Sequence, residues 1–249
     1  MKLLENQGFT NKTYKDEENN LFIKIKSFDS FNHKTDYKLL NKLSFSPEVI
    51  ENTPEKLVTK WIDGKTLNSE SLTNKQLKII GEHLITLHNS RLPFFKENQI
   101  ARRFKVYREK IKKLQRKIPI LDKYYKKINI FLKSIDTSAP VHNDLWLFNM
   151  IENENDIYIT DWEYATMGDV HFDLAYFIES SNLNKEQEKI FLDAYGDDFE
   201  EKYLLIHKII VNALIILWVY QHEVLPFETT IYEKRVEKYM NIYLKEYSK

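Results

Sequence analysis

Strand-like and helix-like patterns occupy separate parts of this chain of 249 residues, and that separation limits the folds open to it. Near the N-terminus, two short apolar segments at 21–25 and 57–62 are typical of strands, and the segment 34–43 has helical spacing. Beyond residue 64 the spacing is mostly helical, with one further strand at 157–160. We therefore expect an α+β fold with a small β-rich N-terminal lobe and a larger, mostly helical C-terminal lobe.

The turn Asp63-Gly64 closes the second strand and marks the expected boundary between the lobes. This divides the chain into an N-terminal lobe at 1–63 and a C-terminal lobe at 64–249. In the larger lobe helices are predicted at 77–88, 186–195, 202–222 and 228–247.

The composition indicates a cytoplasmic protein. The chain has no cysteine, so a disulfide framework and a thiolate metal site are both excluded. Its first residues lack the apolar stretch of a secretion signal. The most apolar segment, 209–220, is too short and too polar to span a bilayer, and we expect a buried helix there without membrane insertion.

Charge is balanced overall, with 37 basic and 37 acidic side chains, which removes any global attraction to nucleic acid. Two segments of the chain nevertheless carry a strong excess of one charge. Residues 101–133 carry 13 Lys or Arg against two acids, whereas residues 144–201 carry 16 acids against two Lys. The basic stretch has an apolar helical stripe and is expected to be a solvated helix face. The acidic stretch suits metal ions and a cationic small-molecule substrate.

Three polar residues carry the chemistry that the sequence predicts. Asp144 and Asn149 lie in one short segment, and Asp161 follows twelve residues after Asn149, at the end of an apolar strand. Phosphoryl transfer requires a carboxylate near the attacking hydroxyl and oxygen ligands for the magnesium that bridges the phosphates. Asp144 is expected to accept the hydroxyl proton, while Asn149 and Asp161 bind the metal.

The spacing His142-x-Asp144-x4-Asn149, followed by a strand and Asp161-Trp162-Glu163, resembles the choline kinase and aminoglycoside phosphotransferase superfamily. Downstream, the segments 161–165, 168–169 and 172–175 resemble the choline kinase branch, particularly the short bacterial enzymes that make phosphocholine. The resemblance implies a two-lobed, protein-kinase-like fold that uses ATP and Mg²⁺.

The same resemblance assigns a nucleotide site in the smaller lobe. It implies that Lys24 holds phosphates and that a hinge near 59–63 pairs with adenine through its backbone. The turn at 8–11 has one glycine, unlike a protein-kinase loop. The usual acidic partner of the strand lysine is a glutamate, and the best candidate here is the shorter Asp36. The residues expected to contact the nucleotide are Thr10, Asn11, Lys24, Thr59, Lys60, Trp61 and Ile62.

Further roles follow from the resemblance. His142 is expected to organise the catalytic segment through hydrogen bonds, and Asp173 to brace it. Glu179 either faces the substrate ammonium or lies exposed on the surface. Trp218 and Tyr232 are expected to line the acceptor pocket, because a quaternary ammonium donates no hydrogen bond and is held by carboxylates and aromatic faces.

These observations predict an ATP- and Mg²⁺-dependent phosphotransferase whose acceptor is a small cationic alcohol, with choline favoured. Ethanolamine, thiamine and an aminoglycoside are alternatives within the same fold. An alternative of another class is a non-catalytic nucleotide-binding protein. A protein kinase is disfavoured because the chain has neither a Gly-rich loop nor an Ala-Pro-Glu segment.

Overall fold

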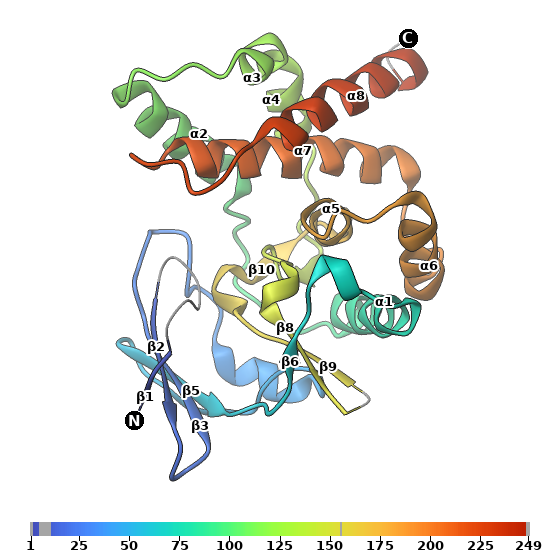
Figure 1. The fold of residues 1–249 in the computed structure, drawn as a ribbon. Coiled ribbons are helices and arrows are strands. Elements are labelled where there is room, and N and C mark those ends of the chain that lie inside the picture. Colours follow the sequence, from blue (N-terminus) through green and yellow to red (C-terminus); the bar gives the residue numbers. More distant parts are fainter. Residues whose placement is uncertain (1, 5–10, 155, 248–249) are drawn as a thin grey trace.

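The computed structural model describes residues 2–4, 11–154 and 156–247, and its strands and helices separate in space as they do along the chain. The blue N-terminal sheet lies at one end, and the helices fill the other (Figure 1). The strands are β1 (Lys2–Leu3), β2 (Lys12–Asp16), β3 (Leu21–Ile25), β4 (Val49–Asn52), β5 (Lys56–Lys60), β6 (Lys65–Thr66), β7 (Ala139–Val141), β8 (Met150–Asn153), β9 (Asp156–Ile159) and β10 (Thr166–Gly168). The α-helices are α1 (Asn74–Asn89), α2 (Ile100–Lys113), α3 (Pro119–Lys123), α4 (Tyr125–Lys133), α5 (Val170–Ser180), α6 (Lys185–Tyr195), α7 (Glu201–Tyr220) and α8 (Thr230–Tyr247).

The N-terminal sheet has five antiparallel strands in the order β1-β2-β3-β5-β4. β3 lies in the middle, where Lys24 is in register with Thr13 of β2 and Leu57 of β5. Lys24 is only 5% exposed. Because a buried ammonium group is costly without an opposite charge, this lysine needs an acidic partner.

The helix expected at 34–43 is shorter than predicted and is a 3-10 helix, Tyr37–Lys42. Asp36 caps it by accepting a hydrogen bond from the N–H of Lys38 at 3.0 Å. Within this helix, Tyr37 and Leu40 are the buried side chains. Isolated helical segments of this length are unstable, so packing of these two side chains sets the extent of the helix.

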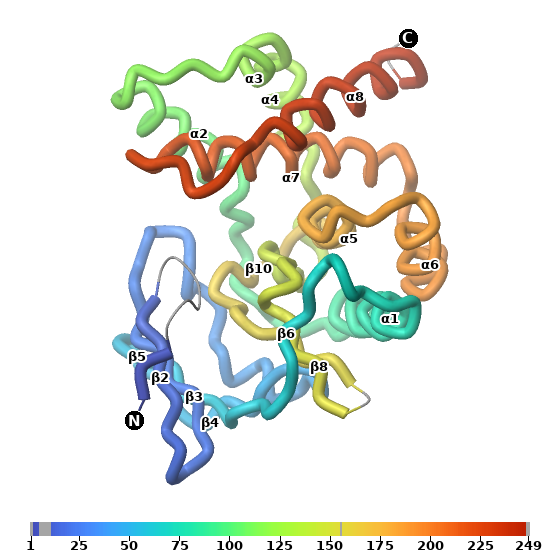
Figure 2. Tube along the Cα trace, viewed as in Figure 1, coloured from blue at the N-terminus to red at the C-terminus, as the bar shows by residue number. Residues whose placement is uncertain are grey.

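Two small sheets, β6-β8-β9 and β7-β10, follow the N-terminal sheet along the chain. In the view of Figure 2, the yellow segment that carries β8 and β10 lies between the blue N-terminal sheet and the helices. The connections at 142–149 and 160–165 join these strands. The predicted catalytic motif therefore lies on two short connections between β-strands.

Helix α7 is the central element of the larger lobe, with α2, α5 and α8 packed against it. Its residues Ile209, Val211 and Ile216 are fully buried. The expectation that the segment 209–220 is too short and too polar for a membrane span is wrong, because the helix extends to 20 residues and qualifies by length and composition. However, 78% of its apolar window is buried inside the protein. This burial is typical of a core helix.

Local signals fix where α1 and α6 begin. Thr73 forms a capping box with Gln76 at the start of α1, and Asn184 forms one with Gln187 at the start of α6. The two helices pack closely at Gly81, where a Cβ atom would lie 2.7 Å from a backbone oxygen of α6.

The α+β fold predicted from the sequence, with a β-rich N-terminal lobe and a mostly helical C-terminal lobe, is confirmed.

Candidate active site

The catalytic segment 142–149 is held by hydrogen bonds from within the larger lobe. Asp173 of α5 is fully buried and accepts hydrogen bonds from the backbone N–H groups of His142 and Asn143 at 2.7 and 2.8 Å. The His142 Nε2 lies 2.9 Å from the carbonyl oxygen of Thr160, and its Nδ1 accepts from the N–H of Asp144 at 3.2 Å. His142 thus ties together the two connections that carry the motif. The geometry supports organising roles for His142 and Asp173.

Asp144 is held by a tyrosine and lies near a buried arginine. Tyr176 of α5 donates its hydroxyl hydrogen bond to Asp144 Oδ1 at 2.7 Å. Arg103 of α2 is 4% exposed, and its guanidinium lies 4.3 Å from the centre of the Tyr164 ring. Burial raises the pKa of Asp144, and the Arg103 charge and the Tyr176 hydrogen bond oppose that rise. These two groups favour the ionised carboxylate that a general base requires.

Asn149 and Asp161, the predicted metal ligands, lie on the same two connections as Asp144 and His142. The amide nitrogen of Asn149 donates to the carbonyl of Asp144 at 3.0 Å. Asp161 has a left-handed backbone conformation, with φ of 61° and ψ of 52°. Such a conformation costs a non-glycine residue about 1 kcal/mol or more, so the surrounding structure must hold it. The Asp161 carboxylate accepts a hydrogen bond from the Lys24 ammonium group.

Lys24 of the N-terminal sheet therefore meets the motif of the larger lobe. Its ammonium nitrogen pairs with Asp161 and lies 3.8 Å from Glu163 Oε2. Asp36, the candidate partner from the sequence, is exposed and caps the 3-10 helix instead. The ion pair of Lys24 thus joins the two lobes rather than two elements of the smaller lobe.

Glu163 is a third carboxylate at this junction. It is 3% exposed, and its Oε2 accepts a hydrogen bond from the Asn11 amide at 2.5 Å. Burial and the charge of Asp161 raise the pKa of Glu163 to about 8, against the attraction of Lys24.

The residues of the smaller lobe that were predicted to contact the nucleotide differ in burial and in hydrogen bonding. The Asn11 side chain contacts Glu163, and it also accepts from the N–H of Ser27 at 2.9 Å. Thr10 lies outside the described residues. Thr59 is buried in β5, and Ile62 is partly buried just beyond it. The N–H groups of Lys60 and Trp61 donate to backbone carbonyls at 2.9 and 3.0 Å.

A cluster of aromatic rings adjoins Asp144 through Tyr176. The Trp146 ring centre is 6.0 Å from that of Tyr176 and 6.4 Å from that of Phe227. Phe227 in turn stacks on Trp218 at 6.1 Å and lies 6.2 Å from Tyr232. The structure therefore brings the two predicted pocket residues together with three rings that the sequence did not identify. We call Trp146, Tyr176, Trp218, Phe227 and Tyr232 the aromatic wall.

Glu179 is neither exposed nor free. It is 1% exposed, and its carboxylate accepts hydrogen bonds from Asn212 at 2.9 Å and from Tyr239 at 2.8 Å. Arg235 lies 3.3 Å from the same carboxylate. Surface exposure, one of the two expectations, is wrong because these partners from α7 and α8 bury the carboxylate. These bonds support a role in joining α5 to the two helices that carry the aromatic wall.

Some functional residues gave a sequence signal and others gave none. Trp146 lies two residues after Asp144, and Tyr176 lies three after Asp173, so position within the motif could have identified both. Phe227 and Arg103 come from segments far from the motif. Only the tertiary fold brings them to Asp144.

Comparison with known proteins identifies the family. A family model described as choline/ethanolamine kinase matches residues 10–209. A relative named Protein LicA homolog from Metamycoplasma hominis is 68% identical over 246 residues, covering 99% of each chain. The resemblance to the choline kinase branch that the motif predicted is confirmed.

Solved structures agree on the fold. The crystal structure of choline kinase LicA from Streptococcus pneumoniae has a TM-score of 0.74 at 22% identity, covering 97% of this chain and 92% of that one. A structure of LicA in complex with AMP has a TM-score of 0.77 at 22% identity, covering 97% and 91%. The predicted two-lobed kinase-type fold is confirmed. The chain belongs to the choline/ethanolamine kinase family and is an ATP-binding phosphotransferase that acts on the alcohol group of a small molecule.

Proposed function

We propose that this protein transfers the γ-phosphoryl group of ATP to choline, with Mg²⁺ as the metal ion. The observation that carries the proposal is the position of Asp144. Its carboxylate accepts a hydrogen bond from Tyr176 of the aromatic wall, whose rings suit a quaternary ammonium, and it shares its segment with Asn149, an oxygen donor suited to a metal-bound triphosphate. We further propose that the protein works in the cytoplasm and that its lobes meet at a hinge near 59–63.

The donor set fits magnesium. Mg²⁺ prefers hard oxygen ligands from one or two side chains together with phosphates and water. We assign the amide oxygen of Asn149 and the carboxylate of Asp161 as these ligands. When bound, the ion neutralises charge on the phosphates. In this proposal Lys24 exchanges its contact with Asp161 for a phosphate oxygen, and Asp144 accepts the proton of the attacking hydroxyl.

The adenine would bind at the hinge through few backbone groups. The N–H groups of Lys60 and Trp61 already donate to carbonyls of the smaller lobe. We therefore assign the adenine contact to the backbone of Ile62 and to the hinge carbonyls. Thr10 remains a proposed phosphate contact, whereas the bonded side chain of Asn11 supports a role in positioning Glu163.

The acceptor pocket favours choline over ethanolamine. A primary ammonium requires hydrogen-bond acceptors, whereas a trimethylammonium group is held by aromatic faces, each worth about 0.5–2 kcal/mol. Glu179, the acidic candidate for this pocket, already accepts from Asn212 and Tyr239. The rings of the aromatic wall are therefore the better fit, and they suit the cation without a hydrogen-bond donor.

A substrate panel tests this proposal. ATP consumption is measured with Mg²⁺ and, in turn, choline, ethanolamine, thiamine and an aminoglycoside, and the values of kcat/KM are compared. We expect choline to exceed each of the others by at least about tenfold. A larger value for ethanolamine or thiamine would reject choline as the acceptor.

The same samples test the non-catalytic alternative. A rise in melting temperature with ATP and Mg²⁺, without turnover on any alcohol, would indicate a nucleotide-binding protein instead of an enzyme. The presence of Asp144, Asn149 and Asp161 in one site favours the enzyme.

A further inference from the structure

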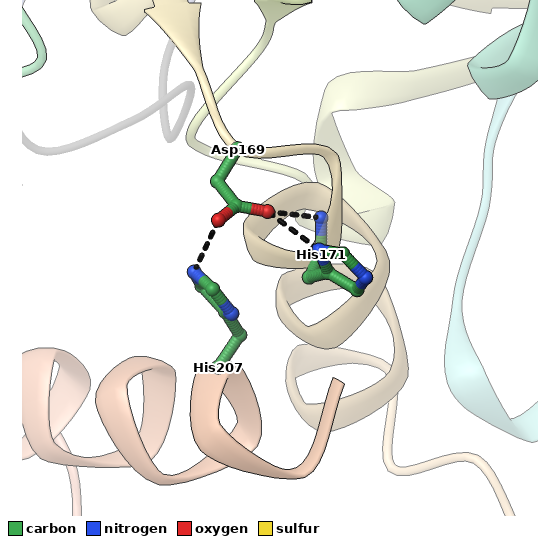
Figure 3. Close-up of side chains that lie close together, drawn as sticks. All are labelled: Asp169, His171 and His207. Carbon is green, nitrogen blue, oxygen red and sulfur yellow. Dashed lines mark hydrogen bonds and ion pairs between the residues drawn. The ribbon is translucent and has the colours of Figure 1, made fainter. Parts of the chain in front are cut away.

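A second group of ligating side chains lies away from the catalytic residues, where α5 begins against α7. Asp169, His171 and His207 point toward one another there (Figure 3). They are 5%, 7% and 1% exposed, and their ligand atoms all lie within 4.8 Å of one another. Nothing in the proposed phosphoryl transfer uses them.

The hydrogen bonds of His207 leave one nitrogen without a suitable partner. Its Nδ1 lies 2.8 Å from the carbonyl oxygen of Tyr203. A carbonyl only accepts, so Nδ1 carries the proton and the neutral ring has a lone pair on Nε2. That buried nitrogen has no hydrogen-bond partner among the described residues, yet it lies 3.3 Å from Asp169 Oδ2. Two groups that both offer lone pairs face each other, which calls for a cation between them.

A second proton on His207 is the simplest such cation, but burial opposes it. The ring is 1% exposed, and taking a charged imidazolium out of water is costly. Asp169 already has three other donors. It accepts from the N–H and the Nδ1 of His171 at 3.0 and 2.6 Å, and from the N–H of Asp136 at 3.1 Å.

The outer nitrogens of both histidines have the acceptors that metal-bound histidines use. His207 Nδ1 faces the Tyr203 carbonyl, and His171 Nε2 lies 3.0 Å from the carboxylate of Glu200. A histidine that binds metal through one nitrogen almost always donates its other N–H to a carbonyl or a carboxylate. For His171 this requires the proton to move from Nδ1 to Nε2, and the N–H of Glu200, which donates to Nε2 at 3.0 Å, must then give up that hydrogen bond.

We propose that Asp169, His171 and His207 form a site for a divalent transition-metal ion of the zinc type. Two imidazoles and one carboxylate are a donor set that zinc binds tetrahedrally, with water in the fourth position. Ligand atoms on such an ion lie about 3.3 Å apart, so modest ring rotation closes the set. The ion would join the start of α5 to α7. Because α5 carries Asp173 and Tyr176, the metal would fix the helix that braces the catalytic segment.

The experiment measures metal binding rather than activity. Protein stripped with a chelator is titrated with Zn²⁺ and with Co²⁺ in the absence of nucleotide. We expect about one ion per chain, a rise of several degrees in melting temperature, and the visible absorption of tetrahedral Co²⁺. The Asp161→Asn variant, which weakens the proposed Mg²⁺ site, should keep all three responses.

Substitutions of His207 and Glu200, each with a control variant, locate the ion. His207→Gln should lose tight binding, whereas His83→Gln should not, although His83 also pairs with an aspartate, at 2.7 Å. Because His207→Gln affects the core, Glu200→Ala serves as a second variant at an exposed carboxylate. It should weaken Zn²⁺ binding about tenfold or more, whereas its exposed neighbour variant Glu201→Ala should leave it unchanged.

Two results would overturn the proposal. One is a stripped wild-type protein that binds neither Zn²⁺ nor Co²⁺ at micromolar concentration, which would assign the cluster to a protonated His207 paired with Asp169. The other is an equal response of wild type, His207→Gln and Glu200→Ala, which would put the ion elsewhere.

Discussion

The catalytic segment and the aromatic wall meet at Asp144 but are built in opposite ways. The catalytic groups come from residues 142–163, and buried hydrogen bonds fix their positions. The aromatic wall comes from the catalytic segment, α5, α7, α8 and the loop before α8, and ring packing holds it together. Hydrogen bonds demand specific residue types at specific spacings, whereas packing accepts many combinations of rings. The chemistry is thus tightly specified, while the acceptor preference can change with few substitutions.

The sharpest test of this contrast is Asp144→Asn. The amide keeps the shape of the side chain but cannot accept the hydroxyl proton, so kcat should fall by about 10²- to 10⁴-fold. ATP affinity and choline affinity should change little, because neither the phosphate ligands nor the rings are altered. Steady-state kinetics and nucleotide titration measure both. A rate near that of the wild type would remove Asp144 as the base.

Glu163→Gln tests the electrostatics of the catalytic segment through stability. The pKa of Glu163 is raised from 4.5 to about 8 in the folded protein, so folding favours the protonated form. The resulting stabilisation is fully present below about pH 4.5 and is lost as pH rises towards 8. Glutamine is neutral at every pH. The free energy of unfolding of the variant, relative to that of the wild type, should therefore increase across that window by an amount on the order of 2–4 kcal/mol.

Urea unfolding without nucleotide or metal, from pH 5 to 8.5, measures this difference. Taking the difference between wild type and variant largely cancels the titration of groups that do not contact Glu163. The exposed Glu70→Gln serves as the control and should show no such trend. A gap that stays constant with pH would contradict the raised pKa.

Substitutions in the aromatic wall should instead affect only the binding of choline. Phe227→Ala or Trp218→Ala removes a ring that is proposed to contact the trimethylammonium group. The KM for choline should rise about 3- to 30-fold, and the KM for ATP should stay within about twofold. Tyr125→Ala, an exposed ring on α4, is the matched control. An unchanged KM for choline would assign that ring to packing only.

The same contrast explains what the sequence could predict. The strand at 21–25 and the helices at 186–195 and 202–222 were predicted to within two residues, because alternation and helical spacing are local signals. The 3-10 helix was overestimated, since its length depends on packing rather than on spacing. The hydrogen-bonded catalytic motif was recognisable for the same local reason.

Residues that act across the fold were not predictable. Arg103 belongs to the basic stretch, which was expected to be a solvated face, yet it is 4% exposed and its charge acts on Asp144. Phe227 lies in a loop without regular periodicity. The partner of Lys24 was sought nearby in the sequence, whereas the fold supplies Asp161 from 137 residues away. In each case the pairing depends on how the lobes and helices pack, which local patterns do not encode.

The smallest expected effect comes from Tyr176→Phe. Tyr176 belongs to the aromatic wall and also bonds to Asp144, so this variant separates its two roles. Phenylalanine keeps the ring in the aromatic wall, so the KM for choline should change little. The lost hydrogen bond had favoured the ionised form of Asp144, so the pKa of Asp144 should rise. Because the base acts when ionised, the acidic limb of the kcat/KM profile should move to higher pH, with little loss of rate at alkaline pH.

The control is Tyr195→Phe, which removes a buried hydroxyl bonded to His88 at 2.9 Å and should leave that limb in place. If the limb stays put in Tyr176→Phe, or if choline binding weakens instead, Tyr176 belongs to the aromatic wall alone and Asp144 is tuned by Arg103 without it.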